Sequence, residues 1–437
     1  MNSKFLKWIC FLFIFLYILM YSSFVLANSN EPTVNTPSCI LLNLNTGNII
    51  YSKGANDKYY PASTTKVMTA ILTLENCNLT DKATVSHDAI FDVPVGYTNA
   101  ALVEGEVISI RDLLYALMIP SANDAAFVLA EHIAGSVDNF SNMMNQKAEE
   151  IGCKNTHFVN PNGIHNEDHY STAYDLALIG QYAMKNETFR KIVSTTQYTL
   201  PTTNKYDKTD RFFVTTNELL KTSSKYYYKY TTGCKTGYTD AAKNCIIATA
   251  KKDDVELLAV VLYDSRSDDG TSLREVDCKT LFEYGFNNFT LKSIINTSDV
   301  VDTIKIPGAT SDTKSLDLNV SEDIYAFIPS DYDLSNITPS ISLKEDLTAP
   351  ILKNTVIGTV SYSINGNEYS SELIASHDVY KSEIFKVLIE LILVILFLIL
   401  VALILKRKKR TKRKSYKKGS KKRSNTSHLD YYHLHYK

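Results

Sequence analysis

The chain contains 437 residues, of which 45% are hydrophobic and 21% charged, a globular composition with room for two or three domains. Residues 8–405 hold 30 basic and 46 acidic residues, so the overall net charge of −1 combines an acidic body with a basic C-terminal tail. An acidic body excludes sequence-independent binding of nucleic acid, because the phosphate backbone would be repelled.

The N-terminus has the pattern of a secretory signal peptide, predicted over residues 1–27. Lys4 and Lys7 precede a long apolar run, and small residues lead to a cleavage site after Ala27. A retained membrane anchor is the alternative interpretation, and the chain is exported under either one.

The first motif is the stretch Pro61-Ala-Ser-Thr-Thr-Lys66, which follows a predicted β-hairpin at residues 38–52 and precedes an apolar helical run. In a helix that begins near Ser63, residues i and i+3 share a face, so the Lys66 amine would approach the Ser63 hydroxyl. Serine is a weak nucleophile that needs such a neighbouring base. Alone the pattern is weak, because a helix cap followed by a solvated lysine gives the same residues.

Ser121 and Asn123 are predicted to lie in a loop between two helices. Residues 110–118 have a helical apolar pattern that ends at Pro120, and a second helix is expected over residues 125–134. We expect polar side chains at such a junction to project into a cleft.

Histidines and cysteines give the weaker signals. A Ser-His-Asp triad is an alternative that the histidines raise, but the Ser63–Lys66 pair already supplies a base, so we interpret them as structural. The cysteines after the signal peptide show no C-x-x-C pair and no zinc spacing, which favours free thiols and no metal site. The histidines concerned are His87, His157, His165 and His169.

Lys235-Thr236-Gly237 is predicted to lie on an edge strand, ahead of apolar strands at residues 245–250 and 256–263. A glycine in a strand lets a ligand backbone come close. An extended substrate can pair with a free strand edge of this kind.

Short alternating apolar runs begin at about residue 297 and are separated by turns such as Asn365-Gly366. They predict a small all-β domain over residues 297–379. This region carries no chemical motif, so we interpret it as a spacer.

Residues 387–405 are apolar except for Glu390, which is long enough for a transmembrane helix. The basic tail over residues 406–437 predicts a cytoplasmic end. A basic amphipathic helix on the membrane surface is the alternative, but the run has no polar face. We therefore expect a single-pass protein of the cell membrane with its main body outside.

The motifs stand in the order Ser63-x-x-Lys66, Ser121-x-Asn123 and Lys235-Thr236-Gly237, a set typical of penicillin-binding proteins and class A β-lactamases. With the blocks Pro120-Ser-Ala-Asn-Asp-Ala-Ala and His157-Phe-Val-Asn-Pro-Asn-Gly-Ile-His, the chain resembles the low-molecular-weight D-alanyl-D-alanine carboxypeptidases, the serine DD-peptidases of the penicillin-binding protein family. The resemblance implies an α/β serine DD-peptidase/β-lactamase-like domain, an antiparallel sheet with helices, over residues 30–292.

The resemblance also implies the chemistry. Ser63 would attack the D-Ala-D-Ala bond of a peptidoglycan stem peptide, a neutral Lys66 would take its proton, and Ser121 would relay a proton to the leaving D-alanine. Asn123 would hold the substrate amide and position Lys66. β-Lactam antibiotics would act as inhibitors, and no metal or organic cofactor is implied.

Substrate binding is implied for the third motif and its neighbour. Lys235 and Thr236 would bind the terminal carboxylate beside Gly237, and the backbone N–H groups of Ser63 and Tyr238 would form the oxyanion hole. Tyr238 departs from the family, which often has His there. The turn Ala241-Ala-Lys-Asn244 also departs from the expected glycine-containing turn, and Arg274 is a further candidate for the carboxylate.

Two other functions stay open. A β-lactamase shares the first chemical step, but no Glu-x-x-Leu-Asn stretch follows Ser121 at a fitting distance. A catalytically silent wall-binding protein is the alternative from a different class, and the intact set of motifs argues against it.

Overall fold

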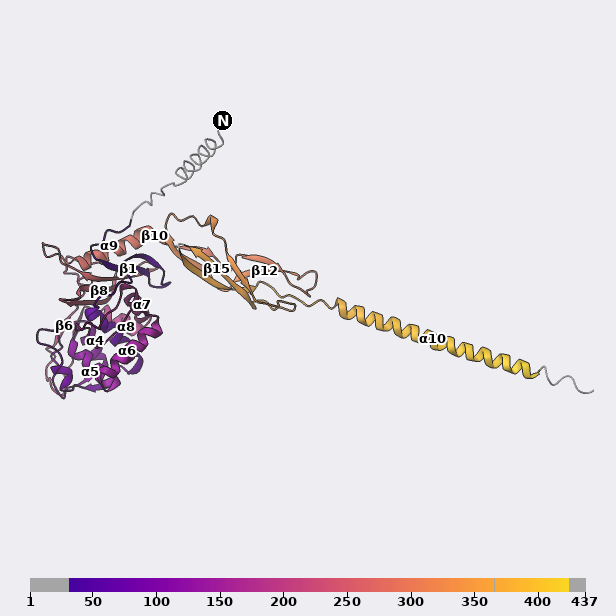
Figure 1. Cartoon of the computed structure of the whole chain (residues 1–437), viewed down its shortest axis with the longest axis horizontal. Coiled ribbons are helices and arrows are strands. Elements are labelled where there is room, and N and C mark those ends of the chain that lie inside the picture. The colour runs from indigo at the N-terminus through magenta and orange to yellow at the C-terminus, as the bar shows by residue number, and fades with distance from the viewer. Residues whose placement is uncertain (1–30, 365, 424–437) are drawn as a thin grey trace, which may run out of the picture. The chain divides into compact units, whose positions relative to one another are not determined.

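The computed structural model describes residues 31–364 and 366–423 (Figure 1). The predicted signal peptide, residues 1–27, lies outside the described residues. The chain divides into two compact units, whose limits fall within β10 (Phe289–Ile295), within β13 (Ile324–Pro329) and after Tyr332. Each unit is described by itself.

The first unit is built on a five-stranded antiparallel sheet in the order β2-β1-β9-β8-β7. The predicted hairpin forms β1 and β2, and the predicted apolar strands form β8 and β9. β7 carries Lys235-Thr236-Gly237 at the edge of this sheet, as the sequence predicted. The strands are β1 (Ser38–Asn43), β2 (Ile49–Lys53), β7 (Thr231–Thr239), β8 (Lys243–Lys252) and β9 (Val255–Asp264).

Both faces of this sheet are covered, because successive side chains of a strand point to opposite faces. Ile40 and Val260 pack into a core shared with most of the helices, whereas Leu41 and Ala259 pack against α9. The helices are η1 (Ala62–Thr65), α2 (Lys66–Asn76), α3 (Asp88–Phe91), α4 (Ile110–Met118), α5 (Asn123–Ala134), α6 (Val137–Ile151), α7 (Ala173–Ala183), α8 (Glu187–Val193) and α9 (Leu273–Asn288).

Side-chain caps fix the starts of several helices. Ser109, Ser136 and Thr172 each accept a hydrogen bond from the backbone N–H three residues further on, at the starts of α4, α6 and α7. Two short strand pairs complete the unit: β3 (Lys82–Thr84) with β4 (Val107–Ser109), and β5 (Gln197–Thr199) with β6 (Phe212–Val214).

The second unit contains an antiparallel sheet in the order β11-β12-β16-β15-β14, which confirms the all-β character that the alternating runs predicted. Its strands are β11 (Asp302–Lys305), β12 (Ser315–Val320), β14 (Ser340–Leu343), β15 (Val356–Ile364) and β16 (Asn367–Ala375), with η2 at Leu334–Asn336. Leu316, Leu318 and Val320 are buried while the residues between them are more exposed.

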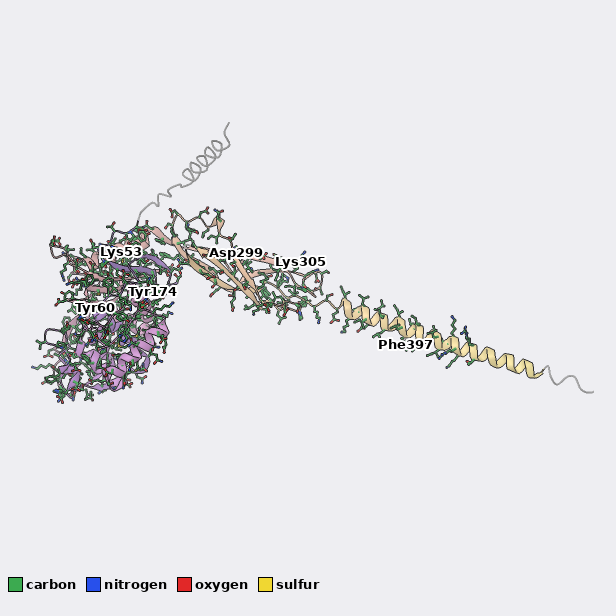
Figure 2. All side chains as sticks on the ribbon, viewed as in Figure 1. Lys53, Tyr60, Tyr174, Asp299, Lys305 and Phe397 are labelled. Carbon is green, nitrogen blue, oxygen red and sulfur yellow. The ribbon has the colours of Figure 1, made fainter. Side chains whose placement is uncertain are left out.

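The chain continues into α10 (Ile384–Arg423), which contains the predicted transmembrane segment. By length and composition, Lys386–Thr411 is apolar enough to cross a membrane. Its apolar side chains point outward from the helix, as Phe397 illustrates (Figure 2). None of the most apolar stretch of this helix is buried against the other residues that the structure describes, which fits a helix that faces lipid.

Candidate active site

Ser63 lies in the turn η1, directly before α2. The sequence predicted that an α-helix begins near Ser63, but the structure has a 3₁₀ turn over Ala62–Thr65 and the α-helix begins at Lys66. The tighter turn keeps Ser63 and Lys66 on one side, with 2.9 Å between Lys66 Nζ and Ser63 Oγ. The predicted approach of the Lys66 amine to the Ser63 hydroxyl is therefore present.

Lys66 is completely buried, and its amine has three neighbours. Besides Ser63 Oγ, Nζ lies 2.8 Å from Asn123 Oδ1 and 2.8 Å from the Asn162 carbonyl oxygen. Burial holds the pKa of Lys66 well below its ordinary value, and the nearby Lys235 lowers it further. A neutral amine has two N–H donors and one lone pair. Because both oxygens can only accept, the lone pair is left facing the Ser63 hydroxyl.

Asn123 is held so that its carbonyl oxygen must face Lys66. Its side-chain amide donates to the Thr98 carbonyl at 2.8 Å, and its backbone N–H donates to the same oxygen at 2.9 Å. Asn123 is the first residue of α5, so the helix also fixes its backbone. This geometry matches the predicted positioning of Lys66.

The Asn162 carbonyl is a part of the site that the sequence analysis missed. Asn160 Oδ1 accepts from the Gly163 N–H at 2.7 Å and shapes the loop. Gly163 has φ +80°, and a Cβ added there would lie 1.8 Å from the Ala62 carbonyl oxygen, so only glycine fits. The signal was the turn-rich block that begins at His157, but nothing in it shows that a backbone oxygen would be used.

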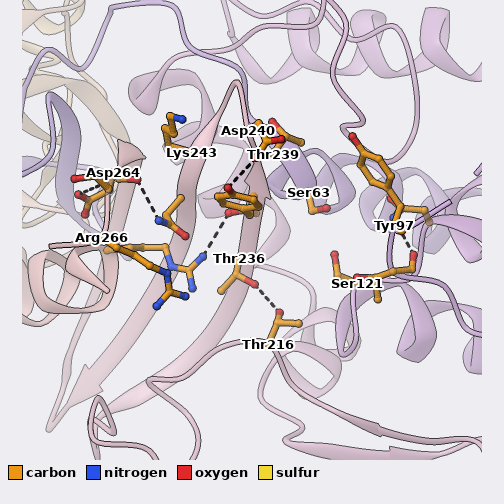
Figure 3. Close-up of a pocket in the computed structure, with 18 of the residues that line it drawn as sticks. Ser63, Tyr97, Ser121, Thr216, Thr236, Thr239, Asp240, Lys243, Asp264 and Arg266 are labelled. Atoms are coloured by element: carbon orange, nitrogen blue, oxygen red, sulfur yellow. Dashed lines mark hydrogen bonds between the residues drawn. The ribbon is translucent and has the colours of Figure 1, made fainter. Parts of the chain in front are cut away.

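Ser121 and Asn123 come together at the cleft as predicted from their place between α4 and α5. Ser121 has a left-handed backbone, with φ +72°, and it lines the cleft with Ser63 (Figure 3). Among the described hydrogen bonds, none joins the Ser121 hydroxyl to Lys66. Its role as a proton relay stays a prediction.

Lys235 is the second buried amine of the site. Its Nζ donates to the Thr236 carbonyl at 2.9 Å, and burial lowers its pKa to about 7. Arg274 contributes to the same lowering. The Thr236 and Thr216 hydroxyls lie 2.5 Å apart (Figure 3), and Thr216 is a cleft residue that carried no motif in the sequence.

Gly237 brings the edge strand close to Ser63. A Cβ added at Gly237 would lie 2.9 Å from the Ser63 backbone nitrogen and 3.1 Å from the Pro61 carbonyl oxygen. A larger residue would therefore push β7 away from Ser63. This approach sets the space between the Ser63 and Tyr238 backbones, where the oxyanion hole is predicted.

Arg274 reaches the same strand from α9. Its Nη1 lies 3.4 Å from the Gly237 carbonyl oxygen, and Glu275 Oε1 accepts from its Nη2 at 2.5 Å. Arg274 lines the cleft, and its role as a further candidate for a carboxylate stays a prediction.

The cleft has a volume of about 940 Å³ and runs from Ser63 and Ser121 past β7 to the turn after it (Figure 3). Lys243 and Asn244, which belong to the turn that departs from the family pattern, both line the cleft. Tyr238 points its ring outward, and its hydroxyl donates to Asp240 at 2.9 Å.

The histidines do not build a rival site, and neither does Cys234, the thiol next to Lys235 in the sequence. His169 Nδ1 accepts from the Val159 N–H, so Nε2 carries the proton and donates to Thr65 Oγ1 at 2.8 Å. Burial lowers the pKa of His169 to about 3, which keeps the ring neutral and structural. Burial raises the pKa of Cys234 to about 12, so its thiol stays protonated in the core.

Together these groups can activate Ser63 to take an acyl group from a bound substrate. The site has a nucleophile whose proton faces an amine lone pair, a place for an oxyanion, and an ammonium and a hydroxyl suited to a carboxylate. All of them come from η1, α2, α5, the loop around Asn162 and β7 in the first unit.

Comparisons with known proteins agree with this chemistry. The family model described as D-alanyl-D-alanine carboxypeptidase matches residues 26–266, and that of the penicillin-binding protein 5 C-terminal domain matches residues 289–381. The D-alanyl-D-alanine carboxypeptidase DacF of Bacillus subtilis is 31% identical over 360 residues, 81% of this chain and 88% of that protein. The D-alanyl-D-alanine carboxypeptidase of Streptomyces sp. (strain K15) is 35% identical over 268 residues, 59% of this chain and 89% of that protein. Penicillin-binding protein 5 from Haemophilus influenzae has a similar structure, with a TM-score of 0.64 and 28% identity over 80% of this chain and 99% of that one.

Proposed function

Because the chain belongs to the D-alanyl-D-alanine carboxypeptidase family, we propose that Ser63 carries the acyl-enzyme of its reaction. The chain is a serine-type carboxypeptidase. Its substrate is a peptidoglycan stem peptide ending in D-Ala-D-Ala, and the reaction releases the terminal D-alanine. β-Lactams inhibit it by acylating the same serine. The observation that carries the proposal is the lone pair of Lys66, which the Asn123 and Asn162 oxygens leave directed at Ser63.

The first step forms a bond between Ser63 Oγ and the carbonyl carbon of the penultimate D-alanine. Lys66 takes the Ser63 proton and becomes an ammonium. The charge that develops on the carbonyl oxygen is stabilised by the backbone N–H groups of Ser63 and Tyr238. Asn123 and Asn162 supply acceptors for the new ammonium before it forms, so little reorganisation is needed.

The tetrahedral intermediate then breaks its bond to the nitrogen of the terminal D-alanine. The proton on Lys66 passes through the Ser121 hydroxyl to that nitrogen, and D-alanine leaves as a neutral amine. Its carboxylate is held by Lys235 and Thr236 beside Gly237 until it departs. Water then attacks the carbonyl carbon of the ester on Ser63, and Lys66 accepts a proton of the water. When the bond between that carbon and Ser63 Oγ breaks, Lys66 returns the proton to Oγ, so that the serine hydroxyl is restored and the shortened peptide leaves with a new carboxyl group.

The site is carried on an exported chain that its C-terminal helix anchors. An apolar helix fits the anchor, and the model of the penicillin-binding protein 5 C-terminal domain matches the region before it. We place the carboxypeptidase domain, residues 30–292, and the β-rich domain, residues 297–379, outside the cell. Residues 387–405 would span the membrane once and residues 406–437 would lie in the cytoplasm, because a dense positive flank is retained on that side.

The test is release of D-alanine from a pentapeptide ending in D-Ala-D-Ala by the purified full chain in detergent. We expect steady release by the wild type and none by Ser63→Ala, while the matched variant Ser52→Ala, at an exposed serine of β2, retains it. Release by Ser63→Ala at the wild-type rate would overturn the assignment of the nucleophile. Rapid turnover of benzylpenicillin without D-alanine release would favour a β-lactamase instead.

A further inference from the structure

Asp124 is a buried acid beside the active site that the reaction above does not use. It follows Asn123 in the first turn of α5, and only 2% of the residue is exposed. Its carboxylate accepts hydrogen bonds from the backbone N–H groups of Ala100 and Leu102, at 2.9 and 3.2 Å. Because hydrogen bonds from two N–H groups to one carboxylate fix the backbone that carries them, Asp124 anchors this distant segment to the start of α5.

The segment that Asp124 anchors, residues 98–102, has a conformation that its own residues do not favour. Ala101 has φ +52°, in the left-handed region that an alanine adopts only at a cost in free energy. The segment contains no glycine, which would adopt this conformation freely. Side chains hold it instead: Asn99 Oδ1 accepts from the Ala101 N–H at 3.1 Å, and the Tyr206 hydroxyl donates to the Ala101 carbonyl at 2.5 Å. The shape of the segment therefore depends on hydrogen bonds of this kind, including those to Asp124.

The same segment orients the amide of the active site. The carbonyl of Thr98 accepts from both the backbone N–H and the side-chain amide of Asn123, at 2.9 and 2.8 Å. These two bonds leave Asn123 Oδ1 facing Lys66, whose Nζ lies 2.8 Å away. If Thr98 moved, the Asn123 amide would be free to rotate and present its NH2 group, which cannot accept a hydrogen bond from the amine. The acceptor for Lys66 thus depends on Thr98, and through the segment on Asp124.

We propose that Asp124 is a positioning residue of the reaction. It holds residues 98–102 in place, and the Thr98 carbonyl then keeps the oxygen of the neighbouring Asn123 directed at the amine of the base. The proposal rests on the proposed function, because it concerns the base of that reaction. Asp124 does not line the cleft, whereas Thr98 does. Asp124 therefore acts through the segment and through its charge, without touching the substrate.

The titratable groups near Lys66 come from three parts of the first unit. Burial and the Lys235 cation on β7 lower the pKa of Lys66, and the Asp124 carboxylate on α5 opposes them. His169 is neutral, because burial lowers its pKa to about 3. Burial raises the pKa of Asp124 as well, but the backbone N–H groups that donate to it favour its ionised form. Loss of the Asp124 charge, like loss of the Asn123 acceptor, would destabilise the ammonium form of Lys66.

The experiment measures the rate at which saturating benzylpenicillin acylates Ser63 at a series of pH values, by intact-protein mass spectrometry of the full chain in detergent. The wild type is compared with Asp124→Asn, which keeps the shape of the side chain but loses its charge and one acceptor oxygen. Asp277→Asn on α9 is the matched control. Asp277 is also completely buried, and its carboxylate accepts from the backbone N–H groups of Asn35 and Thr36, both at 2.8 Å. The segment that it holds does not line the cleft.

We expect Asp124→Asn to change the pH profile and not only the amount of active protein. The pH at which the acylation rate reaches half its plateau should fall by about one unit, because the pKa of Lys66 falls when its ammonium loses support. The plateau itself should fall by about tenfold, since Lys66 becomes a weaker base. Asp277→Asn should keep the wild-type profile. Both variants should melt below the wild type, because each leaves a backbone N–H without its acceptor.

An unmoved half-plateau pH in Asp124→Asn would overturn the proposal even where the rate falls, because loss of stability alone lowers the rate equally at every pH. The same shift in Asp277→Asn would overturn it too. If Asp124→Asn does not fold, Tyr206→Phe decides the outcome, because it removes only the half-buried hydroxyl that holds Ala101. Its plateau should fall by about threefold, and a wild-type plateau would overturn the proposal. A wild type that is neither acylated nor releases D-alanine would overturn the proposed function itself.

Discussion

The two units each contain a five-stranded antiparallel sheet, but the sheets are used differently. In the first unit β1 is buried along its whole length, because helices cover one face and α9 the other. In the second unit β12 alternates, with Leu316, Leu318 and Val320 inside and polar residues between them. Because helices cover both faces of the first sheet, charged groups near its edge are buried, and burial changes their pKa.

The difference lies in the surroundings of the charges. Lys66 and Lys235 are enclosed by the core of the first unit, and burial is the main cause of the lowered pKa of each. In the second unit Asp302 and Glu372 are exposed, where water screens their charge. The sheet of the first unit therefore has buried amines near its edge strand. Among the described residues of the second unit, no charged side chain is buried in this way.

The largest expected effect is the loss of catalysis in Lys66→Gln. Glutamine keeps a polar side chain of similar length but cannot take the Ser63 proton, so kcat for D-alanine release should fall by roughly 10³-fold. Stopped-time measurement of released D-alanine checks this. Lys82→Gln, at an exposed lysine of β3, is the matched control and should keep the wild-type kcat. Equal kcat in both variants would contradict the assignment of Lys66 as the base.

The second sheet should respond through stability instead. Leu318 is fully buried, so Leu318→Ala should lower the stability of the second unit by about 3 kcal/mol through the lost contacts and the cavity. Leu352→Ala is the control, because Leu352 is 69% exposed and should cost little. Hydrogen exchange of the β12 and β16 amides measures the loss. A fall in kcat in Leu318→Ala would contradict the separation of roles between the two sheets.

Gly237→Ala tests the contact between β7 and η1. The added methyl group would meet the Ser63 nitrogen, so β7 must move and the oxyanion hole with it. We expect acylation by benzylpenicillin to slow by about 100-fold, the effect of a displacement of about 1 Å. Intact-mass measurements of the adduct over time give the rate. A wild-type rate would show that Tyr238 on β7 does not contribute to the oxyanion hole.

A smaller effect is expected from pH. The pKa of Lys235 is lowered to about 7, so in the free enzyme its cation is lost as the pH rises above that value. The substrate carboxylate binds more weakly once the Lys235 cation is lost. On this alkaline side of the pH profile, kcat/KM should fall by about tenfold per pH unit. Lys235→Arg keeps its charge at every pH used and should shift this fall upward by more than one unit. If the alkaline fall of kcat/KM occurs at the same pH in Lys235→Arg, the titrating group is not Lys235.

The sequence predicted the parts of the site that are side chains at fixed spacing. The spacing of one helical turn predicted that Ser63 and Lys66 lie side by side. Gly237 and the apolar strands that follow predicted that Lys235 lies on an edge strand. It did not predict the Asn162 carbonyl or the Thr98 carbonyl, because a backbone oxygen leaves no signature in residue type.

The remaining differences have geometric causes. The 3₁₀ turn η1 replaces the expected first turn of the helix. Ala62, directly before Ser63, adopts φ +47°, a conformation that an alanine in the sequence does not predict. Asp264 stands beyond an irregularity in the β8–β9 register, so alternation along β9 could not show that it lines the cleft. In the second unit regular alternation runs through β12 and β16, and the all-β character was predictable for that reason.

The most direct test of the account is the pH dependence of Ser63 acylation by benzylpenicillin, followed by intact-protein mass spectrometry of the full chain. Penicillin adds to Ser63 without the later water step, so the rate reports Lys66 as a base. At saturating benzylpenicillin, where binding no longer limits the rate, the account predicts an acylation rate that rises to a plateau well below pH 10.5, the ordinary pKa of a lysine, and a single adduct that Ser63→Ala lacks. A rate that keeps rising to pH 10.5 would contradict it, because Lys66 would then be protonated at neutral pH.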